Sequence, residues 1–433
     1  MSTQGLRKAI TLRYAIALYV SSVLGPSILV MPGLAANLAG PGSLIAWIGL
    51  SLASFPFAYT FASLSARHPE SGGVYSFSKE AFGFRIGVVT SWLFAFWFIT
   101  GAPAVTLIAA SYLGYAFPLS RAETFLAAVA IIASAFLVNF RGIVVSSKVQ
   151  LAVIVSIVAV ILAATLSSLG EVRLTNFSPF FPEGILAVGT AASLIFWSYL
   201  GYENVSNVAE EFENPKRDFV RSIFLSVLLI GVLFTSVSFV TIGTGVYTHG
   251  GGSVAPFAAM LSNVIGRYAA VVIAILTAFI ILSTANAYMT GMSRVIYAAS
   301  RDGAMPSVLN KLDPKTRAPI RALVALFSSS MVALLIFYFL KVNLETALLL
   351  PSGAAIVVYV IGSSAGIKLM KNSRTKVILA GISLAISLVI LPFVGVLLAA
   401  SFVTILAALL YTFLSKRRNG TVEKSEVATP RKA

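Results

Sequence analysis

One carboxylate, Glu203, stands inside a long apolar stretch of this chain. It follows Phe196-Trp197-Ser198-Tyr199-Leu200-Gly201-Tyr202, within a segment that runs from about residue 185 to residue 209. An ionised group at the centre of a bilayer is costly unless it faces a polar cavity or a partner. A buried carboxyl also tends to stay protonated, so Glu203 could carry a proton. The alternative is a neutral carboxyl that only stabilises the backbone around it.

Two apolar stretches contain residues that interrupt a helix. In Leu24-Gly25-Pro26-Ser27, proline removes a backbone donor and glycine permits unusual dihedral angles. The stretch 198–202 does the same more weakly. Interrupted helices at corresponding positions of two halves of a chain indicate an inverted-repeat transporter site. The alternative is that glycine and proline only kink these two helices.

The composition indicates an integral membrane protein. Of the 433 residues, 58% are hydrophobic and only 11% are charged. There is no cysteine and there are only two histidines, so we expect no disulfide, no metal site and no cofactor. The net charge of +16 is typical of basic cytoplasmic loops, and we expect no binding of nucleic acid.

Twelve apolar runs are long enough to cross a bilayer, which predicts an all-α integral membrane fold. Their cores are residues 14–36, 42–65, 84–115, 122–140, 147–169, 185–210, 219–243, 262–298, 320–340, 343–367, 376–393 and 395–415. The two interruptions then fall in helices one and six, which would be discontinuous.

The basic residues predict the orientation of these helices. If the N-terminus is inside, only Arg121, Arg173, Arg267 and Lys341 lie in outside segments, and the other 27 of the 31 Lys and Arg lie inside. Such an asymmetry is a strong topology signal. It predicts a multi-pass protein of the cell membrane with both termini in the cytoplasm.

Three polar motifs carry a family resemblance. Pro69-Glu70-Ser71-Gly72-Gly73-Val74-Tyr75 resembles the P-x-S-G-G-x-Y signature of amino acid–polyamine–organocation permeases. Glu213-Asn-Pro-Lys-Arg-Asp218 resembles that family's loop after helix six, and Ser300-Arg301-Asp302-Gly303-Ala304-Met305-Pro306 its loop after helix eight. The motifs agree in order and spacing, so the resemblance covers essentially the whole chain. Neutral amino acid exporters and archaeal amino acid permeases look most similar.

The resemblance implies a LeuT-type fold with two inverted five-helix repeats. The expected segments are a cytoplasmic N-terminus at 1–13, repeats at 14–169 and 170–367, helices eleven and twelve at 368–415, and a basic disordered tail at 416–433. A broken helix offers free N–H groups at one half and free carbonyls at the other, which suits a zwitterion.

The resemblance also implies where an amino acid binds. Its carboxylate would lie near Gly25, Pro26 and Ser27, and its ammonium near the carbonyls of Trp197 and Leu200. Because Pro26 lacks an N–H, the Ser27 or Ile28 amide or the Ser27 hydroxyl would have to replace that donor. The expected substrate-binding residues are Ser22, Gly25, Pro26, Ser27, Ile28, Phe196, Trp197, Leu200, Gly201 and Tyr288.

Gating and coupling residues follow from the same resemblance. Trp197 matches a gate over the substrate, and Glu203 matches a position associated with transport and its pH dependence. Proton-coupled relatives carry a lysine on helix five that is missing near Ser156 here. A sodium site could instead use oxygens of Ser21, Leu24, Ser283 and Thr284, although membrane Ser and Thr usually bond to their own helix.

Helix three is expected to select the substrate's side chain. It offers Ala95, Phe96, Ile99, Gly101 and Ala102, with no amide or acid; arginine-binding relatives place an Asn at the position of Ile99. We therefore expect a secondary transporter of neutral, mainly apolar amino acids, proton-coupled or exchanging, and not an enzyme. The alternatives are a sodium symporter, a transporter of another amine or a nucleobase, and a membrane sensor or channel. The expected partners are the bilayer and H⁺ or Na⁺, and the chain would be a monomer or homodimer.

Overall fold

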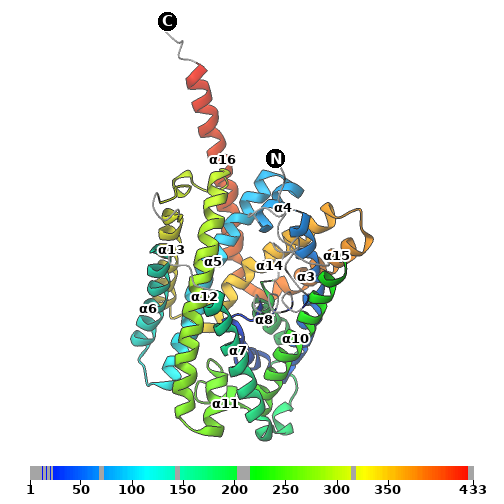
Figure 1. Ribbon diagram of the computed structural model, residues 1–433, viewed down its shortest axis with the longest axis vertical. Coiled ribbons are helices and arrows are strands. Elements are labelled where there is room, and N and C mark those ends of the chain that lie inside the picture. The colour runs from blue at the N-terminus through cyan, green and yellow to red at the C-terminus, as the bar shows by residue number, and fades with distance from the viewer. Residues whose placement is uncertain are drawn as a thin grey trace.

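The fold was analysed in a computed structural model that describes residues 12, 16, 20, 23–67, 73–141, 147–201, 215–313 and 318–427. Within these residues the chain forms helices and no strand (Figure 1). This agrees with the all-α prediction.

The α-helices fall close to the predicted apolar runs. They are α2 (Met31–Ala39), α3 (Ser43–Arg67), α4 (Gly73–Phe82), α5 (Phe84–Ala116), α6 (Arg121–Phe140), α7 (Ser147–Ser167), α8 (Leu186–Ile195), α10 (Pro215–Thr244), α11 (Pro256–Ile265), α12 (Tyr268–Arg301), α13 (Ile320–Phe339), α14 (Leu344–Leu369), α15 (Arg374–Ile390) and α16 (Leu398–Val427). Short 3-10 helices join them: η1 (Pro26–Leu29), η2 (Gly40–Gly42), η3 (Leu169–Glu171), η4 (Leu174–Phe177), η5 (Phe196–Tyr199), η7 (Val246–Thr248), η8 (Ser307–Leu309) and η9 (Leu391–Leu397).

Eight helical stretches in the described part of the chain are long and apolar enough to cross a membrane. This count differs from the predicted twelve for identifiable reasons. The first half of helix one is mostly outside the described residues. Helix five, α7, counts only over Val155–Glu171, where the description of its side chains becomes continuous, and helix six gives the shorter apolar stretch Leu186–Tyr199. Helices eleven and twelve count as one stretch, Arg374–Ser415. The protein is therefore a multi-pass membrane protein, and twelve helices stay a prediction.

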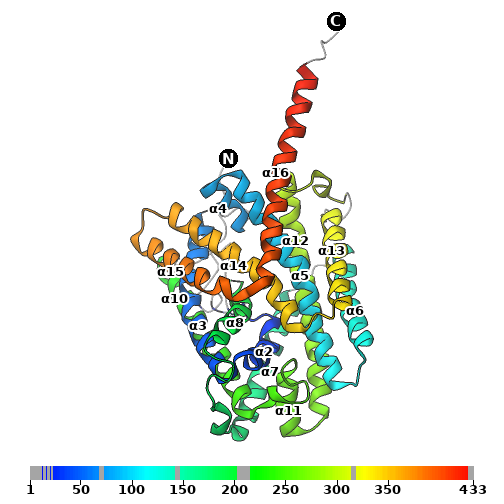
Figure 2. The ribbon, with the colours of Figure 1, turned by 180° about the vertical axis from the view of Figure 1, so that it is seen from behind.

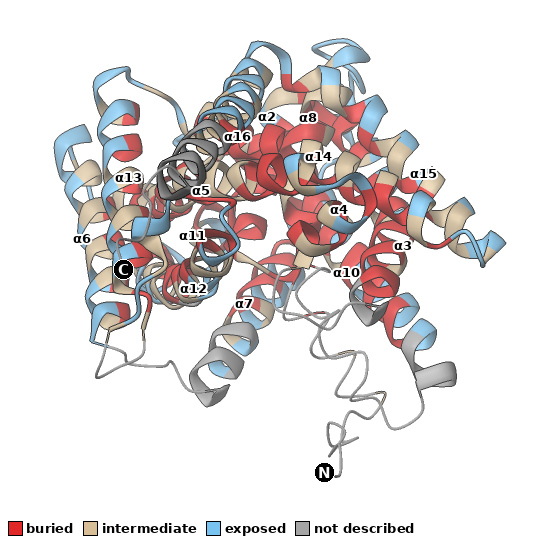
Figure 3. Cartoon of the chain, turned by 90° about the horizontal axis from the view of Figure 1, so that it is seen from above, coloured by how far each residue is buried: buried red, intermediate tan, exposed pale blue. Residues whose placement is uncertain are grey.

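Helix α5 lies at the centre of the helix arrangement. It packs against α12 and α14 most extensively and also against α4, α6, α13 and α16. Seen from above, buried residues gather where these helices face one another, and exposed residues lie on the outer faces (Figure 3). Many exposed side chains are large and apolar, such as Leu52 at 73% and Phe339 at 73% exposed. Such a surface suits lipid, whose tails are as apolar as leucine.

Two boundaries differ from the predicted ones. The run at 262–298 is interrupted at Gly266, whose φ of 87° favours glycine and ends α11 before α12 begins. Helix α16 continues to Val427, into the tail for which we expected disorder at 416–433, and it projects beyond the other helices (Figure 1). The Lys, Arg and Glu residues of that tail are good helix formers, which favours continuation of the helix.

The two predicted faces of the membrane lie at opposite ends of the molecule. Helix α4, which belongs to a predicted inside segment, lies at the end from which α16 projects, whereas α11, from a predicted outside segment, lies at the other end (Figures 1 and 2). This separation agrees with the charge asymmetry of the predicted loops.

Cysteine labelling would assign that orientation, because the chain contains no cysteine. Thr175 and Asn372 are both exposed and lie in segments predicted outside and inside, respectively. We expect Thr175→Cys in intact cells to react with a membrane-impermeant maleimide and Asn372→Cys to react only after the cells are opened. The reverse pattern would show that the orientation is inverted.

Candidate functional site

The first predicted interruption is present at Gly25. The last regular helical hydrogen bond before it runs from the Leu24 N–H to the Val20 carbonyl, at 2.8 Å. The Gly25 backbone is extended, with φ −88° and ψ 178°, so the helix does not continue past Leu24. Pro26 then starts η1, and α2 follows from Met31. The N–H of Ser27 has no hydrogen-bond acceptor among the described residues. Ser27 is only 3% exposed, so this free donor lies inside the protein.

The second predicted interruption is present at Leu200 and Gly201. Helix α8 tightens into η5, after which Leu200 is extended, with φ −86° and ψ 154°. Gly201 has a φ of 121°, a conformation that only glycine adopts without strain. The Leu200 N–H still bonds to the Trp197 carbonyl at 3.2 Å. Regular helical hydrogen bonding therefore stops at this point, inside the protein.

The two interruptions meet in space. Segment η1 contacts η5, and both are enclosed by long helices: α5, α7 and α12 lie against η1, and α3 and α14 lie against η5. The free N–H of Ser27 therefore lies in the same region as the backbone around Leu200, where regular helical hydrogen bonding stops. Donors at one broken helix and acceptors at another are what a zwitterion requires.

The Trp197 ring rests on a glycine of α5. A Cβ atom at Gly101 would lie 2.6 Å from Cη2 of Trp197, 3.2 Å from its Cζ2 and 3.7 Å from Cβ of Pro351. The ring is half-buried. The absence of a side chain at Gly101 thus lets the ring lie directly against α5, beside α14.

Neighbouring aromatic residues anchor η5 to the helices around it. Phe196 is buried and its ring meets Phe57 and Tyr359 edge-on, at 5.5 and 5.2 Å between ring centroids. The Tyr199 hydroxyl shares a hydrogen bond with the Ser51 hydroxyl (2.7 Å) and donates to the Trp47 carbonyl (3.2 Å). Trp197 therefore lies between two anchored residues, and its position depends on α3 and α14.

Two residues near the interruptions were not predicted from the sequence. The Tyr112 hydroxyl on α5 donates to the Leu29 carbonyl at 2.5 Å and ties α5 to the end of η1. The Ser198 hydroxyl is fully buried without a hydrogen-bond partner among the described residues. A serine within an interruption is a signal that could have identified Ser198, whereas the sequence gives no signal for the partner of Tyr112.

The wall that α5 presents is apolar in the structure as well. Its five Ser and Thr hydroxyls donate to carbonyls of the same helix, for example Thr100 to Phe96 at 2.8 Å. Of the predicted wall residues, Gly101 is buried and Ala95, Phe96, Ile99 and Ala102 are half-buried. The Ser and Thr side chains of α5 therefore have no spare donor, and the helix contains no Asp, Glu, Asn or Gln.

Comparisons with known proteins agree with this geometry. The model of the amino acid permease family matches residues 10–420. The chain belongs to this family. It is 33% identical to the uncharacterized amino acid permease YecA of Bacillus subtilis (strain 168), over 84% of this chain and 86% of that protein.

Two further relatives have more specific names. The chain is 28% identical to the L-methionine/branched-chain amino acid exporter YjeH of Escherichia coli (strain K12), over 96% of this chain and 98% of that protein. It is also 28% identical to the branched-chain amino acid permease BcaP of Bacillus subtilis (strain 168), over 73% of this chain and 71% of that protein. The protein is an amino acid transporter and not an enzyme.

Two of the motifs that carry the family resemblance also meet. The Tyr75 hydroxyl donates to the Asp302 carboxylate at 3.1 Å, and Lys79 pairs with the same oxygen at 3.2 Å. Burial and the nearby Asp302 carboxylate raise the pKa of Tyr75 far above its ordinary value, which keeps its hydroxyl protonated as a donor. These residues therefore join α4 to the end of α12.

The remaining predicted site residues differ in burial and in their distance along the chain from the two interruptions, and some lie outside the described residues. Ser21, Ser22 and Glu203 lie outside the described residues. Pro26, Ile28 and Phe196 are buried at the two interruptions, whereas Tyr288 on α12 is 45% exposed. Ser283 and Thr284 are half-buried on α12, which contacts η1, and the Thr284 hydroxyl donates to the Ile280 carbonyl at 2.9 Å. The sodium, gating and proton roles therefore stay predictions.

Proposed function

We propose that this permease carries neutral, mainly apolar amino acids across the cell membrane by alternating access. The observation that carries the proposal is the meeting of η1 and η5 beside the apolar wall of α5. The interruptions would hold the zwitterion common to all amino acids, and the wall would receive the side chain. A cationic side chain against that wall would lose its hydration without gaining a partner, which is costly.

The names of two relatives support this substrate class. YjeH is named for methionine and branched-chain amino acids, and BcaP for branched-chain amino acids. Both names fit a wall without acids or amides. A transporter of another amine or a nucleobase is the alternative, but no feature of the described residues favours it.

We further propose that helices one to five and six to ten form inverted repeats, at 14–169 and 170–367. Alternating access requires that the site be closed to one side of the membrane at a time, and the contacts of α2 support such a closure. A Cβ atom at Gly33 of α2 would lie 2.4 Å from the Ser253 carbonyl oxygen, and the Gly42 N–H bonds to the Phe180 carbonyl at 2.8 Å. The half-helix α2 is thus covered by the predicted outside loops, as in a state closed to the exterior.

Counterflow in proteoliposomes tests the proposed mechanism. Vesicles loaded with unlabelled leucine should accumulate external labelled leucine transiently, because exchange through an alternating site moves label against the total gradient. A channel would only equilibrate the label, and a sensor would move none. Either of those two outcomes would contradict the proposal.

The coupling ion can be assigned in the same vesicles. We propose proton coupling or exchange, so uptake should be equal in sodium and choline buffers. We expect Glu203→Gln to flatten the pH dependence of uptake while leucine binding persists, because the amide cannot exchange a proton. Lower uptake in choline, together with a higher Na⁺ requirement after Ser283→Ala and Thr284→Ala, would favour sodium instead.

A further inference from the structure

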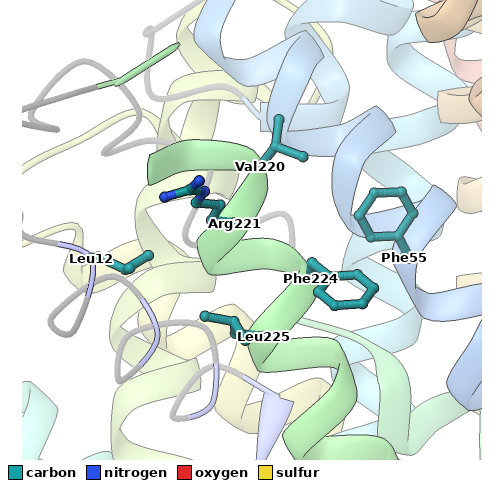
Figure 4. A pocket seen from close by; sticks show the side chains of 6 residues that line it. All are labelled: Leu12, Phe55, Val220, Arg221, Phe224 and Leu225. Atoms are coloured by element: carbon teal, nitrogen blue, oxygen red, sulfur yellow. The ribbon is translucent and has the colours of Figure 1, made fainter. Parts of the chain in front are cut away.

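A long groove lies on the outer face of α3 and α10, away from the proposed amino acid site. It consists of two adjoining hollows of about 500 and 410 Å³ that share Phe55 and Phe224. Figure 4 shows the first hollow, where Arg221 and the apolar side chains of Leu12, Val220 and Leu225 surround the space beside Phe55 and Phe224. The second hollow continues along α10 to Ser236.

The position of the groove requires an apolar occupant along most of its length. Both helices belong to stretches that can cross a membrane, Met31–Leu64 and Val220–Thr244. Leu52, Leu228 and Val232 on its walls are 73%, 54% and 57% exposed. From Arg221 to Ser236 an α-helix rises about 22 Å, more than the ~15 Å of half a hydrocarbon core. The groove is therefore long enough for one lipid chain.

The end of the groove at Arg221 is polar and positively charged. Arg221 lies in the second turn of α10, near the start of the apolar run predicted at 219–243, where headgroups would begin, and it is exposed. It has no ion-pair or hydrogen-bond partner within the described segments of the chain. A guanidinium binds phosphate oxygens in a bidentate manner. On the predicted cytoplasmic side it would meet the leaflet that carries anionic lipids.

The floor of the groove connects it to the interrupted helix. Ser51 lies in the second hollow, and its hydroxyl is the group that bonds to Tyr199 at 2.7 Å. A Cβ atom at Gly231 would lie 2.9 Å from Cβ of Ser51, so α10 contacts this serine closely. Material that fills the groove would therefore press on the layer that anchors Tyr199, two residues from Trp197.

We propose that this groove is a binding site for an anionic phospholipid, with the phosphate on Arg221 and one acyl chain along α3 and α10. The bound lipid supports transport by holding α3 against α10 and so keeping the Ser51–Tyr199 bond in place. The site is separate from the amino acid site and adds to the proposed function.

Lipid retention measured by native mass spectrometry of the full chain tests this proposal. We expect phosphatidylglycerol to be retained more strongly than phosphatidylcholine. Arg221→Gln should weaken phosphatidylglycerol retention about fivefold, since one basic side chain near a membrane surface contributes about 1 kcal/mol. Leu228→Trp, which fills the second hollow, should weaken retention of both lipids. Arg374→Gln, an exposed arginine outside the groove, is the matched control and should change nothing.

Other outcomes identify the rival occupants. Equal retention of the two lipids, or no effect of Arg221→Gln in a variant with a normal melting temperature, would overturn the proposal. A stabilisation by inorganic phosphate equal to that by phosphatidylglycerol would also overturn it, because free phosphate would then suffice. Disulfide-linked dimers of Leu52→Cys in membranes would show a second copy in the groove instead. No amino acid is present in these measurements, so their failure leaves the proposed transport function intact.

Discussion

Gly101→Ala should lower leucine transport about tenfold, the effect of a 1.4 kcal/mol loss. The new Cβ would lie 2.6 Å from Cη2 of Trp197, so the ring must leave its place against α5. The clashing atoms are the far end of the Trp197 side chain, so the ring can rotate away while the anchored backbone of η5 stays in place. Initial uptake rates in proteoliposomes, beside a melting temperature, would measure the two effects separately.

Gly114→Ala is the matched control in the same helix. Its Cβ would meet only the Thr124 hydroxyl, at an ordinary 3.6 Å, so transport should stay normal. The double variant Gly101→Ala with Trp197→Phe should lose no more activity than Trp197→Phe alone, because phenylalanine lacks the atoms that clash. Fully additive losses would mean that Gly101 acts through something other than Trp197.

Gly25→Leu should weaken amino acid binding by roughly a hundredfold or more, about 3 kcal/mol. Any residue can adopt the backbone angles of Gly25, and a Cβ there would meet only the Val23 carbonyl oxygen, at 3.9 Å. The folded protein should therefore accept leucine at this position. Its side chain would then occupy the space beside the free Ser27 N–H, where the substrate carboxylate is proposed to bind. Equilibrium binding of labelled leucine to the purified variant measures the loss.

Gly49→Leu provides the control for that variant. A Cβ at Gly49 has no atom within 4 Å and the residue lies exposed on α3, so binding should be unchanged. Gly25→Ala should have an intermediate effect because its single methyl group fills less of the space. Normal affinity in Gly25→Leu would remove the first interruption from the site.

The interruptions were predictable from the sequence because their causes are local. Pro26 cannot donate a hydrogen bond and Gly201 adopts a φ that other residues avoid, so residue type alone indicates both. The break at Gly266 was missed because the long run at 262–298 predicts one helix, although Asn263 and Arg267 interrupt its apolar residues at this point. Apolar periodicity does not reveal one glycine with a positive φ inside a long run.

Contacts between distant segments could not be predicted in the same way. The Tyr112 bond to the Leu29 carbonyl and the seat of Trp197 on Gly101 depend on how α5 lies against η1 and η5. A glycine and a tyrosine in an apolar run have many ordinary explanations. Only the packing shows that Gly101 leaves room for the Trp197 ring and that Tyr112 bonds to a carbonyl at the end of η1.

Competition for a bound, labelled amino acid tests the central claim most directly. The claim is that two interrupted helices hold the zwitterion and the apolar wall of α5 receives its side chain. With labelled leucine bound to the purified protein, excess unlabelled leucine, methionine or alanine should displace the label, while arginine, lysine, glutamate and putrescine should displace little. Displacement by arginine or putrescine that equals or exceeds displacement by leucine would contradict the account.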